Sequence, residues 1–197
     1  MTPLHRPDLV IDSARLRLRP LTTDDAPFIL ELVNDPDWIR YIGDRGVRDL
    51  DAARRYVTEG PMASYARHGF GLYLVTQRSD AVPIGICGLI QRETLPAPDV
   101  GFAFLPAFRG HGFAAEAVDA LLRCARELAG ADQLYAVVQP DNARSLRLLH
   151  QAGFRPSGTT RLVADGPELT LLSVALGDPG AADRAERDHR RDHSSTI

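Results

Sequence analysis

A glycine-rich turn is the first place in this chain where residue types and spacing suggest chemistry. Arg109-Gly110-His111-Gly112 follows an apolar run that predicts a strand and precedes an alanine-rich run that predicts a helix. Glycines in such a turn let backbone N–H groups approach a ligand, and the N-terminus of the following helix adds partial positive charge. We therefore expect Gly110 to Ala114, together with the Arg109 side chain, to bind phosphate. A turn without a ligand is the alternative.

The surroundings of the turn narrow the choice of phosphate ligand. A dinucleotide site of the Rossmann type needs a carboxylate at the tip of the next strand, where this chain has Val138-Gln139-Pro140. A P-loop needs Gly-Lys-Ser/Thr, where this chain has Gly112-Phe113-Ala114. Both nucleotide interpretations are weakened, and a nucleotide-dependent oxidoreductase is kept only as a minor alternative.

A second motif follows one helix and one strand further along the chain. Asn142-Ala143-Arg144-Ser145 opens a segment that ends in Gly153-Phe154. Together the two motifs resemble the GNAT N-acetyltransferases, whose Arg/Gln-x-x-Gly-x-Gly/Ala loop holds the pyrophosphate of acyl-CoA. Because the arginine directly precedes the first glycine, the turn is similar to that of the RimJ/RimL-like branch, which acetylates the N-termini of ribosomal proteins.

The resemblance implies a reaction. An acetyl group would pass from acetyl-CoA, the cosubstrate, directly to a primary amine in a ternary complex, without a metal. The attacking amine must be neutral, which at pH 7 is rare for a lysine-like amine with a pKa of about 10.4 and far more common for a protein α-amine. The acceptor would be a protein N-terminus or a small molecule. A non-catalytic protein that binds or senses acyl-CoA on the same fold is the alternative.

The resemblance also assigns residues to the acyl-CoA site. Backbone N–H groups near Phe104 and Leu105 would face the thioester oxygen, where charge develops. Their strand would splay from Leu134–Val138 to admit the pantetheine arm. Asn142 would bond the pantetheine amide, although capping its own helix is an equally good role. The full expected set is Phe104, Leu105, Arg109, Gly110, His111, Gly112, Phe113, Ala114, Asn142 and Ser145.

Proton transfer has three candidates. Asp99 opens the strand at a position where relatives often have glutamate, and Glu93 lies in the preceding loop; each is a candidate base, with a solvated loop carboxylate as the alternative. Ser145 is the candidate to protonate or stabilise the departing thiolate, or else is a packing serine. Leu149 stands where many relatives have a tyrosine acid. Histidine is a side chain suited to acid–base work at neutral pH, but we expect His111 at the surface beside the phosphates rather than in catalysis.

The acceptor would be held by the N-terminal helices. The segment Asp37 to Val47 mixes aromatic and charged residues without a clear period. We expect Trp38, Tyr41 and Asp44 to line the acceptor site, with Asp44 suited to an amine and Arg45 to an acidic group. Core packing explains Trp38 and Tyr41 equally well.

The elements that position these residues follow a mixed order. Strands alternate first with short turns and later with helices, and the strand–helix–strand from Val100 to Val138 requires a parallel pair. The expected fold is a mixed, mostly antiparallel central sheet with one parallel strand pair and helices on both faces. The expected strands are 15–19, 71–77, 84–91, 100–105, 134–138 and 169–175, with a further one near Phe154. The expected helices are 22–34, 49–59, 114–129 and 142–151, with a further short one that ends at His68.

Whole-chain properties set the remaining limits. The chain has 197 residues, is 44% hydrophobic and carries a net charge of −3, which fits a cytoplasmic globular protein and argues against nucleic acid or a membrane as partner. We expect an N-terminal arm over 1–12, one domain over 13–176 and a disordered tail over 177–197, whose His189 and His193 could also be spaced for a metal. Cys87 and Cys124 are expected to be free thiols. We expect a monomer or a homodimer.

Overall fold

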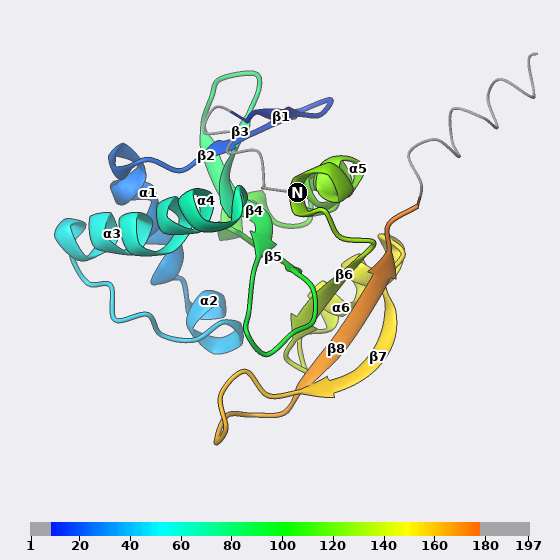
Figure 1. Ribbon diagram of the computed structural model, residues 1–197. Helices are drawn as coiled ribbons and strands as arrows, with labels where there is room; N and C mark the ends of the chain where they lie inside the picture. Colours follow the sequence, from blue (N-terminus) through cyan, green and yellow to red (C-terminus); the bar gives the residue numbers. More distant parts are fainter. Residues whose placement is uncertain (1–8, 178–197) are drawn as a thin grey trace, which may run out of the picture.

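A single mixed sheet organises residues 9–177, the part of the chain that the computed structural model describes (Figure 1). Its eight strands lie in the order β1-β2-β3-β4-β5-β6-β8-β7. Every neighbouring pair is antiparallel except β5 and β6, which are parallel. The expected mixed sheet with one parallel pair is therefore confirmed. The strands are β1 Ile11–Asp12, β2 Leu16–Pro20, β3 Leu72–Gln77, β4 Pro83–Ile90, β5 Asp99–Phe104, β6 Gln133–Val138, β7 Arg155–Thr160 and β8 Leu169–Ala175.

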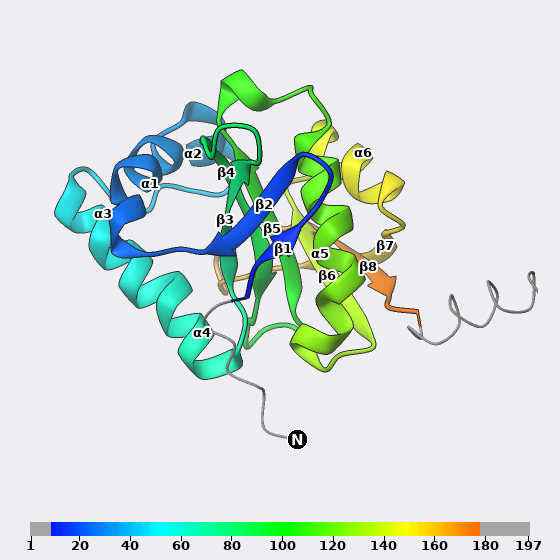
Figure 2. The same ribbon diagram turned by 90° about the horizontal axis from the view of Figure 1, so that it is seen from above.

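Helices cover the two faces of the sheet (Figure 2). One face carries the N-terminal helices α1 Ala26–Val33, α2 Pro36–Tyr41, α3 Leu50–Val57 and α4 Ala63–His68. The other carries α5 Phe113–Ala129 and α6 Ala143–Gln151. Three short turns of other helical type, Thr23–Asp25, Thr58–Met62 and Pro106–Phe108, lie between these elements. No helix within residues 9–177 is long and apolar enough to cross a membrane.

Two hydrophobic cores lie on opposite faces of the sheet. Val100 and Phe104 of β5 pack with residues of α5 in the larger core. Ala103 of the same strand packs against the smaller core, which α1, α2 and α3 build. Because side chains alternate along a strand, the odd-numbered positions of β5 face the N-terminal helices. Asp99 lies on that face.

Two elements differ from the expectation. Helix α2 is absent from the sequence-based prediction, because its six residues are too few to show a period; it begins where the Asp35 carboxylate accepts the N–H groups of Asp37 (3.1 Å) and Trp38 (3.3 Å). Strand β1 consists of the last two residues of the expected N-terminal arm, and a two-residue strand shows no alternation.

Two further expectations concern the termini and the cysteines. Residues 178–197, which make up nearly all of the expected tail and include His189 and His193, lie outside the described residues, as do residues 1–8. Cys87 and Cys124 are free thiols, as expected.

Candidate active site

Strands β5 and β6 part almost as soon as they meet. They are in register only at Asp99 and Tyr135, where the Tyr135 N–H donates to the Pro98 carbonyl at 3.0 Å. Beyond this point β5 continues to Phe104 and β6 to Val138, but no further residue of one strand pairs with a residue of the other. The structure thus contains the splay that the resemblance implied, with Asp99 at its base.

The edge of β5 that faces the splay presents the backbone of Phe104. The N–H of the next residue, Leu105, donates to the Ile84 carbonyl of β4 at 3.0 Å. Because backbone groups alternate between the two edges of a strand, the Phe104 N–H and C=O lie on the β6 side. The expectation for Leu105 is corrected, since its N–H is already used within the sheet. Phe104 stays a candidate donor to the thioester oxygen.

The glycine turn has the backbone that its sequence predicts. Gly110 and Gly112 both have φ of +80°, in the left-handed region that other residues adopt at a cost. Gly112 is the N-cap of α5, a helix of 17 residues. The first N–H groups of a helix have no partner within it, so the turn presents unpaired donors where the helix dipole is positive.

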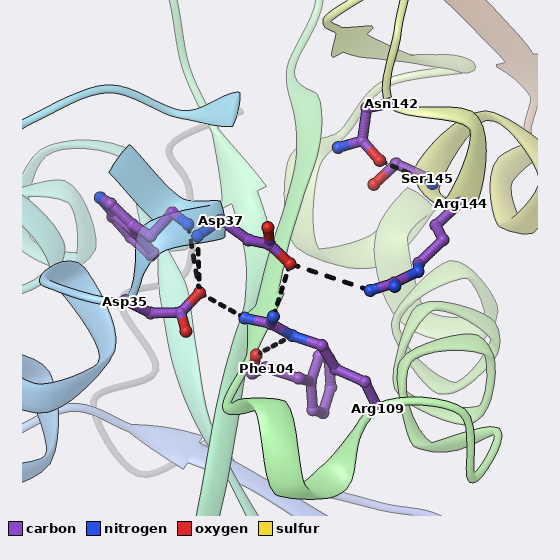
Figure 3. A network of polar contacts seen from close by, with 8 residues as sticks. Asp35, Asp37, Phe104, Arg109, Asn142, Arg144 and Ser145 are labelled. Atoms are coloured by element: carbon purple, nitrogen blue, oxygen red, sulfur yellow. Dashed lines mark hydrogen bonds and ion pairs between the residues drawn. The ribbon is translucent and has the colours of Figure 1, made fainter. Parts of the chain in front are cut away.

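The side chain of Arg109 points toward Asp35 and Asp37 of the α2 region rather than toward the glycine turn (Figure 3). Its Nε donates to the Phe104 carbonyl at 2.8 Å, and its two terminal nitrogens pair with Asp37 at 2.7 Å and Asp35 at 2.5 Å. Asp35 is buried, its side chain 6% exposed, and a buried carboxylate requires such a partner. The expectation that the Arg109 guanidinium binds phosphate is therefore corrected. This side chain joins the end of β5 to α2.

A different cation lies beside the turn. Arg15, directly before β2, donates from Nε to Glu116 at 2.6 Å and from Nη1 to the His111 carbonyl at 3.1 Å. Its guanidinium also lies over the Phe113 ring, 4.6 Å from the centroid. His111 itself is exposed and stacks near Phe113. No local signal marks Arg15 in the sequence, because it reaches the turn from about a hundred residues away.

Helix α6 brings its two predicted residues to the other side of the splay (Figure 3). The Asn142 side-chain oxygen accepts the N–H of Ser145 at 3.2 Å, so Asn142 caps the helix and its amide nitrogen stays available. The Ser145 hydroxyl donates no hydrogen bond within the described residues. Arg144, which is exposed, lies 3.8 Å from the Asp37 carboxylate of α2.

The candidate base is buried and paired. The Asp99 side chain is 3% exposed and accepts a 2.8 Å hydrogen bond from Arg92 Nε. Burial raises the pKa of Asp99 above its ordinary value, although the charge and hydrogen bond of Arg92 oppose the rise. Glu93 is exposed in the preceding loop and forms no ion pair with any residue from 9 to 177. The structure thus buries Asp99 beside a cation and leaves Glu93 at the surface.

The three residues expected at the acceptor have different surroundings. Trp38 is 4% exposed and belongs to the smaller core, so the expectation that it lines the acceptor site is wrong; its bulk is needed to fill that core. Asp44 is exposed, and its carboxylate is already paired with Arg48 at 2.5 Å. Tyr41 is half-buried, with the Arg40 guanidinium 4.9 Å from its ring centroid.

An open groove of about 360 Å³ lies between α3, α4 and the end of β4. Of the polar side chains that line this groove, only Arg45 is singled out by the sequence. The others come from two helices and a loop, and no local motif joins them. The polar side chains that line the groove are Arg45, Tyr56, Glu59, Ser64, Arg67, His68, Gln91 and Arg92. Arg92 connects this groove to Asp99.

Comparison with known proteins identifies the family. Residues 15–155 match the acetyltransferase (GNAT) domain. The uncharacterized N-acetyltransferase p20 of Bacillus licheniformis is 28% identical over 149 residues, which cover 75% of this chain and 83% of that protein. The chain therefore belongs to the GNAT acetyltransferase family, and the expectation of an acyltransferase is confirmed at the level of the family.

Solved structures share the fold. A GNAT-family acetyltransferase from Bordetella pertussis has a TM-score of 0.68 at 26% identity, covering 85% of this chain and 99% of its own. RimL, a ribosomal L7/L12 α-N-protein acetyltransferase in complex with coenzyme A, has a TM-score of 0.72 at 18% identity, covering 85% of this chain and 98% of its own. RimL thus shares the fold of this chain. It is a member of the RimJ/RimL-like branch, to whose glycine turn the turn of this chain is similar.

Proposed function

We propose that this protein transfers an acetyl group from acetyl-CoA to a primary amine. The observation that carries the proposal is the splay itself: β5 leaves β6 after one paired residue and runs directly into the glycine turn at the N-terminus of α5. The turn suits a pyrophosphate and the splay suits an extended arm. RimL, which was solved with coenzyme A, has the same fold.

The cosubstrate would be held by backbone more than by side chains. The free N–H groups from Gly110 to Ala114 would bind the pyrophosphate, with Arg15 and His111 at its border. The Asn142 amide would donate to the pantetheine arm within the splay. The N–H of Phe104 would donate to the thioester oxygen, where negative charge accumulates as the amine attacks.

Asp99 would receive the proton that the attacking amine loses. The bound thioester supplies an activated acetyl carbon; the amine nitrogen forms the new C–N bond, the C–S bond breaks and the electron pair leaves on sulfur. Asp99 takes the amine proton directly or through water, and Arg92 favours the ionised carboxylate needed for this step. The hydroxyl of Ser145 would stabilise or protonate the thiolate.

The test is release of free thiol from acetyl-CoA in the presence of amines. A panel of α-amino peptides, polyamines and amino acids should include an acceptor that raises the rate well above hydrolysis, and mass spectrometry should find the acetylated amine. The matched control is Gly112→Pro, which removes a backbone donor and the required backbone conformation. If wild-type protein releases thiol no faster with any amine than without, the proposal is wrong.

One observation favours a second candidate. Leu149, 1% exposed, fills the position of the tyrosine acid of many relatives. A protein that binds acyl-CoA without turning it over needs no such acid. Tight binding of acetyl-CoA in calorimetry, without acetylation of any amine in the panel, would support this alternative.

A further inference from the structure

We propose that the groove between α3, α4 and the end of β4 binds an anionic group of the acceptor, so that the preferred acceptor is an amine that also carries a carboxylate or phosphate. This inference rests on the proposed function and names the acceptor class. The four positively charged or protonatable side chains that line the groove, which we call the groove cations, are Arg45, Arg67, His68 and Arg92.

The groove has a one-sided charge. It is lined by three arginines and a histidine, against the carboxylate of Glu59 in the lining and that of Asp99, which pairs with Arg92. This local excess of positive charge contrasts with the whole chain, whose net charge is −3. Charged walls of one sign concentrate ligands of the opposite sign. The groove therefore selects for anions and against polycations.

Two of these arginines are uncommitted. Arg45 and Arg67 are both exposed, and neither forms a salt bridge or side-chain hydrogen bond with any of residues 9–177. Most other arginines around the candidate active site are paired, among them Arg15 with Glu116 and Arg109 with Asp35. Guanidinium groups bind carboxylate and phosphate with two parallel hydrogen bonds. Unpaired guanidinium groups that line a groove are thus suited to a ligand.

The groove lies next to the candidate base. Arg92 lines the groove and donates to Asp99 at 2.8 Å. Ile90, also in the lining, is in register with Asp99 across β4 and β5. By strand alternation Asp99 faces the side of the sheet that carries α3 and α4. An acceptor whose anionic end lies in the groove would therefore have its amine directed toward Asp99 and the base of the splay.

The volume limits what fits. A groove of about 360 Å³ is at the small end of ligand sites. It accommodates an amino acid, or the first few side chains of a peptide. A free amino acid and a peptide could both supply the anionic group, and the first experiment distinguishes between them.

The first experiment compares acceptors that differ only in charge. 4-Aminobutyrate is paired with its amide, 4-aminobutanamide, and the peptide Ala-Glu-Glu-Ala with Ala-Gln-Gln-Ala, both peptides having an amidated C-terminus. Because a charged hydrogen bond is stronger than a neutral one, wild-type kcat/KM should favour the acidic member of at least one pair by about tenfold or more. The pair that shows the difference identifies the source as a free amino acid or a peptide. Equal rates within both pairs, or faster neutral acceptors, would overturn the inference.

The second experiment removes the uncommitted charges. The double variant Arg45→Gln/Arg67→Gln should lose about tenfold in kcat/KM for the acidic acceptor, through KM, and much less for the neutral acceptor. Arg55→Gln is the matched control, because Arg55 is exposed on α3 and does not line the groove. If the ratio of kcat/KM for the acidic acceptor to kcat/KM for the neutral one were unchanged in the double variant, anion binding by the groove would be contradicted.

A binding measurement separates this inference from the proposed function. Calorimetry with Ala-Glu-Glu-Ala, in the presence of CoA, does not depend on turnover. Binding that weakens with salt and disappears in the double variant, but not in Arg55→Gln, would support the groove even if no amine were acetylated. If amines are acetylated but the acidic peptide binds wild type and double variant alike, the groove assignment fails while the proposed function stands.

Discussion

The Nε of Arg109 donates to the carbonyl oxygen of Phe104 at 2.8 Å, at the end of β5. This carbonyl lies on the edge that faces β6, where a regular parallel sheet would use it to accept a bond from the neighbouring strand. Arg109 takes that place, and its other nitrogens pair with Asp35 and Asp37. One guanidinium thus occupies the β6-facing edge of β5 and attaches α2 to the open end.

Loss of Arg109 should therefore affect both stability and catalysis. Arg109→Ala leaves the buried Asp35 without its positively charged partner, which typically costs about 3 kcal/mol of unfolding free energy. We expect kcat/KM for acetyl-CoA to fall at least about tenfold, since the Phe104 carbonyl at the splay loses the hydrogen bond from Arg109. Denaturant unfolding and steady-state kinetics measure the two effects. Arg123→Ala, which removes an exposed ion pair with Asp119, is the control and should change neither.

A double variant separates the two roles of Arg109. In Asp35→Asn/Arg109→Met the unpaired buried charge is absent, so much of the stability should return. Activity should stay low, because the Phe104 carbonyl still lacks its donor. Full activity in this double variant would show that Arg109 serves the fold alone.

Asp99 should control the acidic side of the pH profile. A base must be ionised to accept a proton, and burial raises the pKa of Asp99. Activity should therefore fall, on lowering the pH, at a higher pH than an ordinary carboxylate would give. Asp99→Asn should lower kcat and flatten the pH dependence that Asp99 causes. Glu93→Gln, which changes an exposed carboxylate in the preceding loop, is the control and should keep the wild-type profile.

The same substitution has a predictable effect on stability. A carboxyl group whose pKa is raised by folding stabilises the protein below its unfolded pKa, and this contribution is lost as the pH rises through the folded pKa. At neutral pH, Asp99→Asn should therefore not lower the melting temperature. A large drop would mean that the pair with Arg92 stabilises the ionised form more than burial disfavours it.

The conformation of Gly112 should matter separately for binding and for stability. Alanine at φ of +80° is strained by about 1 kcal/mol, and a shifted turn misdirects the N–H groups that would face the pyrophosphate. Gly112→Ala should raise the Kd of CoA by at least about tenfold. The control is Gly130→Ala: Gly130 also has positive φ and open space around it, but lies at the opposite end of α5. If both variants raised the Kd of CoA equally, the proposal that the glycine turn binds the pyrophosphate would be contradicted.

Glu116 should make the protein sensitive to acid. Burial disfavours its charge, but hydrogen bonds from the Arg15 N–H, Ser13 and the Arg15 side chain outweigh burial and lower its pKa. For a carboxyl group with a lowered folded pKa, stability is present above the unfolded value of about 4.3 and is lost as the pH falls through the folded value. Glu116→Gln should cost about 1 kcal/mol at pH 7 and less at lower pH. Urea unfolding at several pH values measures this, with Glu127→Gln as control.

The parts of the fold that can be predicted well from the sequence are those with strong local signals. The run from β5 through α5 to β6 and α6 has regular apolar spacing, glycine boundaries and an asparagine cap, all within a short stretch of chain. The glycine turn follows from the same local signals. Helix α2 escapes prediction because it depends on one cap and one proline rather than on a period.

The side-chain network of the candidate site could not be predicted in the same way. Arg109 meets Asp35 and Asp37 from more than 70 residues away, and only the completed sheet brings them together. The motif correctly marked Arg109 as a special position, but the buried charge of Asp35 decides where its guanidinium points. The groove cations likewise come from the α2–α3 loop, α4 and the β4–β5 loop.

The open end of the splay has a property that follows from how α2 meets α6. The two are connected by exposed ion pairs, Arg40 with Asp141 at 2.8 Å and Arg144 with Asp37 at 3.8 Å (Figure 3 shows the second). Exposed pairs of this kind contribute about 0.2–1 kcal/mol each, far less than either hydrophobic core. Added salt should therefore weaken the link between α2 and the start of α6 more than it weakens either core.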